Sequence, residues 1–187
     1  MLITIVYSLL AIVAIAAIWL IIVYNGLVKS KNQVAEGWAD IEVQLKRRYN
    51  LIPNLIETVK GYTKHEEKVF REVTEARTRA MSSDGMGHER AEAENALSAT
   101  LKSLFAVAEQ YPNLKANENF AKFQDELTDT ENKIQAARRF YNSMVRDYNT
   151  KMEVFPTNVI VGLFSFKSAE FFETDEAAER EPVTVKF

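Results

Sequence analysis

The chain begins with an apolar run from Leu2 to Tyr24 that is broken only by a few hydroxyl groups. As a helix, this run rises about 34 Å, which is enough to cross a hydrocarbon core of about 30 Å. It predicts a membrane anchor over residues 1–28, with the lipid bilayer as first partner. The residues expected to form the anchor are Leu2, Ile5, Leu9, Ile12, Ile15, Trp19, Ile22 and Tyr24. A cleaved signal peptide is the alternative, but the run is long for one and no basic residue precedes it.

The charges that follow the anchor predict its orientation. No charged side chain occurs before Lys29, whereas Lys31 and the basic run Lys46-Arg47-Arg48 come soon after it. Because positive charge stays on the cytoplasmic side, we expect a short N-terminus outside and the rest of the chain in the cytoplasm.

Beyond the anchor, apolar residues recur every three or four positions, which is the spacing of an amphipathic helix. The first stripe covers residues 34–59. Pro53 predicts a kink or break near Asn50, with Asn50 capping a new helix that carries the pattern on to Ala80.

Two further helices are predicted. The polar, glycine-containing stretch 82–87 is typical of a loop, and a helix is expected from about His88 to Gln110. Pro112 ends that helix. A cap at Asn117 or Asn119 then begins the longest stripe, which runs from Phe120 to Phe155.

The expected fold is all-α, with an N-terminal transmembrane helix followed by an antiparallel bundle of three to four long helices. The bundle is assigned to residues 29–156. A two-stranded coiled coil is the alternative, but the aromatic residues Phe120, Phe123, Tyr141 and Tyr148 suit a wider core.

The chain changes character after Pro156. Residues 157–172 are apolar and partly β-prone, and we expect them to pack on the bundle or on a partner. The candidate interface residues are Leu163, Phe164, Phe166, Phe171 and Phe172. Residues 173–187 are acidic and are expected to form a mobile tail.

Composition excludes several kinds of chemistry. The chain has 187 residues, no cysteine and two histidines, so a disulfide scaffold, a thiol nucleophile and a zinc ribbon are excluded. Its net charge of −3 argues against a nucleic-acid binder. No nucleotide-binding or hydrolase motif is present, and we expect no cofactor, metal, catalytic residue or small-molecule substrate.

Polar residues line one strip of the longest helix, beside its apolar stripe. They are Glu131, Arg138, Asn142 and Asn149, and possible facing groups on the first helix are Arg47, Arg48, Asn50 and Asn54. We expect a buried polar network that fixes the register between helices. The alternative is a catalytic site that uses Glu131 and Arg138.

Several blocks of residues resemble a known family in order and spacing. They are Tyr24–Val28, Gln44–Leu55, Val59–Tyr62, Tyr111–Asn117, Thr130–Ile134, Ala137–Asn142 and Tyr148–Asn149. Through these blocks, the chain resembles the LemA family up to about Glu173. The resemblance implies a bacterial protein with one membrane helix, set in the cell (inner) membrane. It implies no catalytic residue, because the family has no established biochemical activity.

The sequence therefore predicts a membrane-anchored helical scaffold or protein-interaction module and not an enzyme. We expect it to assemble with itself or to dock a membrane-protein partner. A membrane-bound enzyme with a polar site on the long helix is the alternative function.

Overall fold

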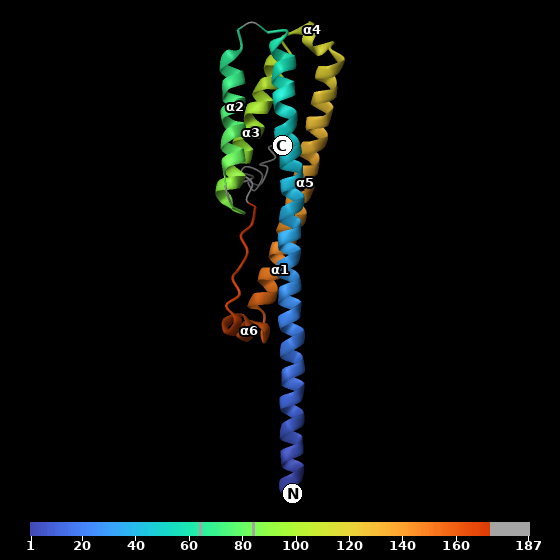
Figure 1. Cartoon of the computed structure of the whole chain (residues 1–187), viewed down its shortest axis with the longest axis vertical. Coiled ribbons are helices and arrows are strands. Elements are labelled where there is room, and N and C mark those ends of the chain that lie inside the picture. Colours follow the sequence, from blue (N-terminus) through green and yellow to red (C-terminus); the bar gives the residue numbers. More distant parts are fainter. Residues whose placement is uncertain (64, 84, 173–187) are drawn as a thin grey trace, which may run out of the picture.

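The computed structural model of the chain describes residues 1–63, 65–83 and 85–172. Within these residues, all regular secondary structure is helical, which confirms the all-α fold (Figure 1). The elements are α1 (Leu2–Lys60), α2 (Glu67–Ser82), α3 (His88–Ala108), the short α4 (Pro112–Lys115), α5 (Glu118–Glu153) and α6 (Thr157–Phe164). The acidic tail expected at residues 173–187 lies outside the described residues.

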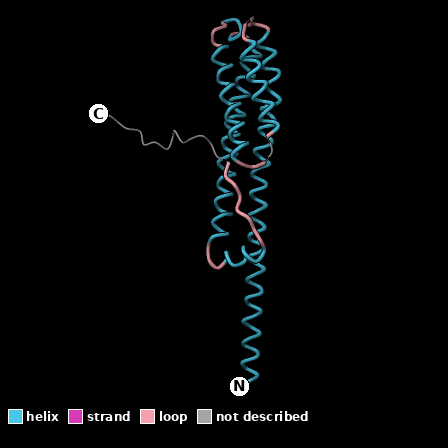
Figure 2. The backbone as a smooth tube through the Cα atoms, turned by 90° about the vertical axis from the view of Figure 1, so that its left-hand side faces the viewer, coloured by secondary structure: helices cyan, strands magenta, loops and turns pink. Residues whose placement is uncertain are grey.

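The four long helices α1, α2, α3 and α5 alternate in direction, as predicted for an antiparallel bundle (Figure 1). α5 runs back beside α1, and α2 with α3 forms a hairpin next to the far end of that pair. Figure 2 shows that α1 continues out of the bundle as a single helix toward the N-terminus. One helix therefore contributes both the exposed apolar segment and a wall of the core.

α1 and α5 approach each other closely at a glycine. A Cβ atom at Gly37 would lie 3.4 Å from the Cα of Tyr141, so even an alanine side chain would be in van der Waals contact with the α5 backbone. Next to this contact, the Trp38 ring packs on the rings of Tyr141, at a centroid distance of 5.5 Å, and Phe172, at 5.8 Å. These contacts fix the register of α1 against α5.

The break expected near Pro53 is wrong, because α1 passes through this proline and ends at Lys60. A proline inside a helix leaves the carbonyl four residues earlier without its usual donor. Here that carbonyl belongs to Tyr49, and the Nε of Arg77 on α2 donates to it at 2.8 Å. The neighbouring helix therefore supplies the hydrogen bond that Pro53 cannot make, and Asn50 caps nothing.

The chain breaks later than predicted, between Lys60 and Glu67, where α2 turns back along the bundle. Residues around this turn are tied to the loops that precede α5. The Nδ2 of Asn117 donates to the Tyr62 hydroxyl at 2.8 Å, and its Oδ1 accepts from the amide of Phe120 at 3.0 Å. Asn117, one of the two predicted candidates, is thus the cap of α5 and also joins the two loops at this end.

The apolar stretch after Pro156 forms a short helix despite its β-prone residues. α6 buries Ile160, and Ser165 then takes a left-handed backbone conformation with φ 54°. The chain next runs back along the bundle without regular structure over residues 165–172, which we call the C-terminal strap (Figure 2).

Candidate functional site

The C-terminal strap is bound by a repeated Tyr-Asn pair on α5. Asn149 makes two hydrogen bonds of 2.9 Å to the backbone of Ala169, and seven residues earlier Asn142 makes two to the backbone of Phe172, at 2.9 and 3.0 Å. The preceding tyrosines donate to strap carbonyls, Tyr148 to Lys167 at 3.1 Å and Tyr141 to Glu170 at 2.8 Å. Because residues seven apart share a helix face, the repeat presents four side chains to one extended segment.

A buried charge cluster joins α1, α3 and α5. The Arg48 guanidinium is fully buried and forms ion pairs with Glu94 and with Glu131, the latter at 2.7 Å. Its Nη1 also donates to the Ser98 hydroxyl at 2.8 Å. Because a buried charge is stable only when it is paired, these contacts hold the three helices in a defined arrangement.

Glu94 is the second centre of this cluster. It is fully buried, accepts a hydrogen bond from the Tyr49 hydroxyl and lies 3.3 Å from the Nε of Arg90. Burial, and then the hydrogen bond to Glu94, raises the pKa of Tyr49 far above its ordinary value. The phenol therefore stays protonated and acts as a donor at physiological pH.

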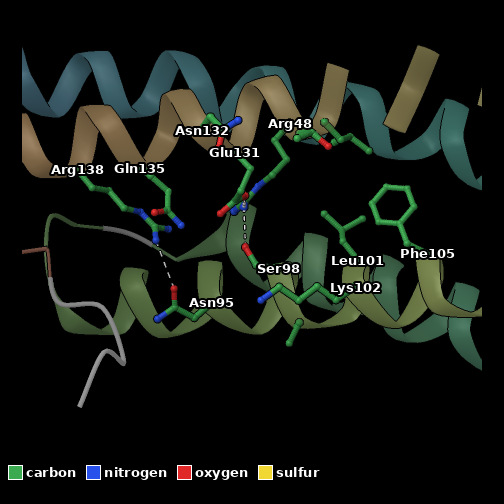
Figure 3. A pocket seen from close by; sticks show the side chains of 13 residues that line it. Arg48, Asn95, Ser98, Leu101, Lys102, Phe105, Glu131, Asn132, Gln135 and Arg138 are labelled. Atoms are coloured by element: carbon green, nitrogen blue, oxygen red, sulfur yellow. Dashed lines mark hydrogen bonds and ion pairs between the residues drawn. The ribbon is translucent and has the colours of Figure 1, made fainter. Parts of the chain in front are cut away.

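Beside the cluster, α3 and α5, together with Arg48 of α1, line a half-open pocket of about 450 Å³ (Figure 3). The residues that line it are Arg48, Asn95, Ser98, Ala99, Leu101, Lys102, Phe105, Leu127, Thr128, Glu131, Asn132, Gln135 and Arg138. Arg138, Gln135 and Asn95 lie at one end, while Leu101 and Phe105 lie at the other end with Lys102 beside them (Figure 3). The pocket is thus amphipathic along its length.

The residues predicted for the polar network fall into three groups. Arg48, Glu131 and Arg138 lie together at the pocket, while Asn142 and Asn149 bind the strap. Arg47 is exposed, 3.9 Å from both Glu126 and Asp129. Asn50 and Asn54 are also exposed and lie outside the network, because the unbroken α1 turns them toward solvent.

The contribution of α3 to the charge cluster, above all that of Glu94, was not predicted from the sequence. A signal was present: Glu94 occupies a core position in the stripe formed by Ala91, Leu97, Leu101 and Leu104. A single acidic residue inside an apolar stripe indicates a buried partner of opposite charge.

The predicted anchor residues are exposed along most of the apolar segment of α1. Leu2, Ile5, Leu9, Ile12, Ile15, Trp19 and Ile22 are exposed, and Tyr24 is half-buried. α1 is long and apolar enough to cross a membrane, with a mean hydropathy of 2.8 over its most apolar window. By length and composition, this helix indicates membrane anchoring.

The candidate interface residues divide between the core and the surface. Phe172 is buried against Trp38, and Phe166 packs edge-on against Tyr24. Leu163, Phe164 and Phe171 remain exposed. The segment therefore packs on its own bundle while keeping an apolar outer surface.

These features define a helical-bundle protein whose first helix extends beyond the bundle as a single apolar segment long enough to cross a membrane. A sequence profile of the LemA family matches residues 37–187, and the chain belongs to this family. The family resemblance drawn from the residue blocks is thereby confirmed.

Three proteins named below are similar in sequence to this chain. Magnetosome protein MamQ 2 of Paramagnetospirillum magneticum is 24% identical over 96% of this chain and 75% of that protein. Protein LemA of Metamycoplasma hominis is 24% identical over 81% of this chain and 69% of that protein. Magnetosome protein MamQ of Magnetospirillum gryphiswaldense is 21% identical over 86% of this chain and 68% of that protein.

Proposed function

We propose that this protein is a membrane-anchored helical scaffold whose bundle binds other proteins and carries out no chemistry of its own. The observation that carries the proposal is the continuity of α1, a 59-residue helix from Leu2 to Lys60. Most apolar side chains in its first part are exposed, and its second part is built into the core. Burying that first part in lipid would fix the bundle rigidly above the membrane.

The end of the bundle near the membrane supports the same proposal. Val154, Phe155, Val159, Leu163 and Phe164 form an exposed apolar surface around α6, which we call the α6 foot. Exposed fractions reach 82% for Phe155 and 70% for Leu163.

The α6 foot lies level with the end of the apolar segment of α1. The rings of Tyr24 and Phe164 are 4.8 Å apart, and Lys31 and Lys167 line a small cleft beside them. Aromatic rings and lysines at one depth suit the interface between lipid tails and headgroups. We propose that the α6 foot rests in this interface, with the N-terminus outside the cell (inner) membrane and the bundle in the cytoplasm.

Binding is favoured over catalysis by the state of the candidate catalytic pair. The Glu131 carboxylate is already paired with Arg48 at 2.7 Å, which opposes its use as a general base. Among the described residues, those that line the pocket include no histidine, aspartate or tyrosine. An enzyme acting through Glu131 and Arg138 remains the second candidate, favoured by the pocket between α3 and α5.

The scaffold proposal is tested by the native mass of the full-length protein in mild detergent, with mass spectrometry of what co-purifies. We expect a discrete homo-oligomer or a stoichiometric membrane-protein partner. As a matched comparison, Leu163→Ser should weaken an assembly made through the α6 foot, whereas Val43→Ser on the flank of the bundle should not. A strict monomer that retains no other protein would overturn the proposal.

The membrane placement is tested with single cysteines, which is straightforward because the native chain has none. Leu163 and Val43 are both exposed apolar residues, at 70% and 63%, so Leu163→Cys and Val43→Cys are matched. With spin labels in lipid nanodiscs, we expect residue 163 to be more accessible to oxygen and residue 43 to a water-soluble nickel reagent. In intact cells, an impermeant maleimide should leave residue 43 unlabelled. Equal oxygen accessibility, or labelling of residue 43, would contradict this placement.

A further inference from the structure

Arg138 is a buried cation with unused donors. Its residue is only 5% exposed, and its Nη1 donates to the Asn95 Oδ1 across the pocket at 3.4 Å. Its Nε and Nη2 are both buried and have no hydrogen-bond partner among the described residues. These two nitrogens form the side edge of the guanidinium, where two parallel N–H groups match the two oxygens of a carboxylate.

The neighbouring carboxylates accept no hydrogen bond from Nε or Nη2 of Arg138. Glu94 is held by Arg48, Arg90 and Tyr49, and Glu131 is held by Arg48. The cluster contains Arg48, Arg90 and Arg138 with Glu94 and Glu131. It therefore has one positive charge in excess, at Arg138. Burial, and then the charge of Arg48, lowers the pKa of Arg138 from its ordinary value, and the opposing charges of Glu131 and Glu94 do not offset this. Because an unpaired buried charge is costly, an anion here would be stabilising.

The pocket at Arg138 also has the shape of a small-ligand site. Its volume of about 450 Å³ lies within the range typical of ligand pockets. Arg138, Gln135 and Asn95 lie at one end, Glu131 and Ser98 lie in the middle, and Leu101 and Phe105 lie at the other end with Lys102 beside them (Figure 3). A ligand along the pocket would thus meet an arginine and two amides at one end and apolar side chains at the other.

We propose that this pocket binds a small organic carboxylate, with its carboxylate on the side edge of Arg138 and its apolar part against Leu101, Phe105 and Leu127. The side-chain amides of Asn95 and Gln135 lie at the same end as Arg138 and can orient the carboxylate. This site is independent of membrane anchoring and of any protein partner.

The carboxylate could come from free solution or from the chain itself. Membrane lipid is too far away, because α1 rises about 36 Å between Tyr24 and Arg48, which lines the pocket. The ring of Phe172, however, lies 4.4 Å from the Arg138 guanidinium, and the acidic residues 173–187 follow it directly in sequence. The two sources share one chemistry and must be distinguished by experiment.

The test uses the full-length protein in phosphatidylcholine nanodiscs, with 4-fluorobenzoate as probe and fluorine NMR as readout. Neutral 4-fluorobenzamide has nearly the same shape and is the ligand control. We expect the carboxylate to bind and the amide to bind at least tenfold more weakly. Arg138→Met should weaken carboxylate binding at least tenfold, whereas Arg139→Met, on the exposed neighbour, should leave it unchanged.

Two further variants complete the test. Ala99→Trp, from the exposed rim of the pocket, should block binding with Arg138 in place, so the test stands even if Arg138→Met fails to fold. A chain ending at Phe172 that binds the probe when the full chain does not would assign the carboxylate to residues 173–187. Equal binding of the amide, binding unchanged by Arg138→Met and Ala99→Trp, or no binding to either chain would overturn the proposal.

Discussion

Replacing Glu94 with alanine is expected to destabilise the protein by about 3–5 kcal/mol, because it leaves a buried charge without its closest partner. Arg48 would keep only Glu131 and Ser98, and the buried Tyr49 hydroxyl would lose its acceptor. Chemical denaturation of the full-length protein in detergent, followed by circular dichroism, measures this loss. A decrease of less than about 1 kcal/mol would contradict the central role given to Glu94.

Two matched variants identify the origin of this loss. Glu131 is the other partner of Arg48, and the Glu131 side chain is one-third exposed. Glu131→Gln should therefore lower the free energy of unfolding by only about 1 kcal/mol. The double variant Arg48→Met with Glu94→Leu should recover much of the stability lost in Glu94→Ala, since it removes both buried charges together. If Glu131→Gln instead abolished a cellular phenotype at unchanged stability, the enzyme alternative would be favoured.

Removing the side-chain amides of Asn142 and Asn149 together is expected to release the C-terminal strap from α5. The double alanine variant loses four hydrogen bonds to the strap backbone, each worth about 1 kcal/mol. The strap would then detach, and Phe172 would lose its place against Trp38. We expect hydrogen exchange over residues 165–172 to accelerate at least tenfold.

The control for the strap experiment is Asn132→Ala. Asn132 is an exposed residue of α5 that lines the pocket and does not contact the strap backbone through a hydrogen bond. It should leave exchange in the strap unchanged. Protection of residues 165–172 that persisted in the double variant would show that the tyrosine hydroxyls and Phe172 suffice to hold the strap.

The strap also gives a physical reason for the Tyr-Asn pairs that contributed to the family resemblance. An extended segment has unpaired backbone groups, and an asparagine amide offers a donor and an acceptor at the spacing of a neighbouring strand. The seven-residue repeat was visible in the sequence, but its partner segment was not. The sequence could therefore place Asn142 and Asn149 on the polar strip of the helix without showing what they bind.

Features that depend on neighbouring residues were determined by the sequence alone. The length of the apolar run predicted the exposed segment of α1, and regular apolar spacing predicted α3 and α5. The cap of α5 was predicted at Asn117 or Asn119, and Asn117 is the one that forms it. Helical period, capping and glycine-rich loops act within a few residues, so a single chain segment contains the information needed to predict them.

Features that depend on contacts across the bundle were decided only by the tertiary structure. Pro53 stays inside α1 because Arg77, 24 positions along the chain, replaces its missing hydrogen bond. Residues 159–164 are helical although several of them are β-prone. The candidate site depends on such contacts most of all. Arg48 and Glu131 were expected on facing helices. Glu94 and the unpaired, buried edge of Arg138 became visible only once α3 was packed beside them, because pairing and burial of charge are properties of the assembled bundle.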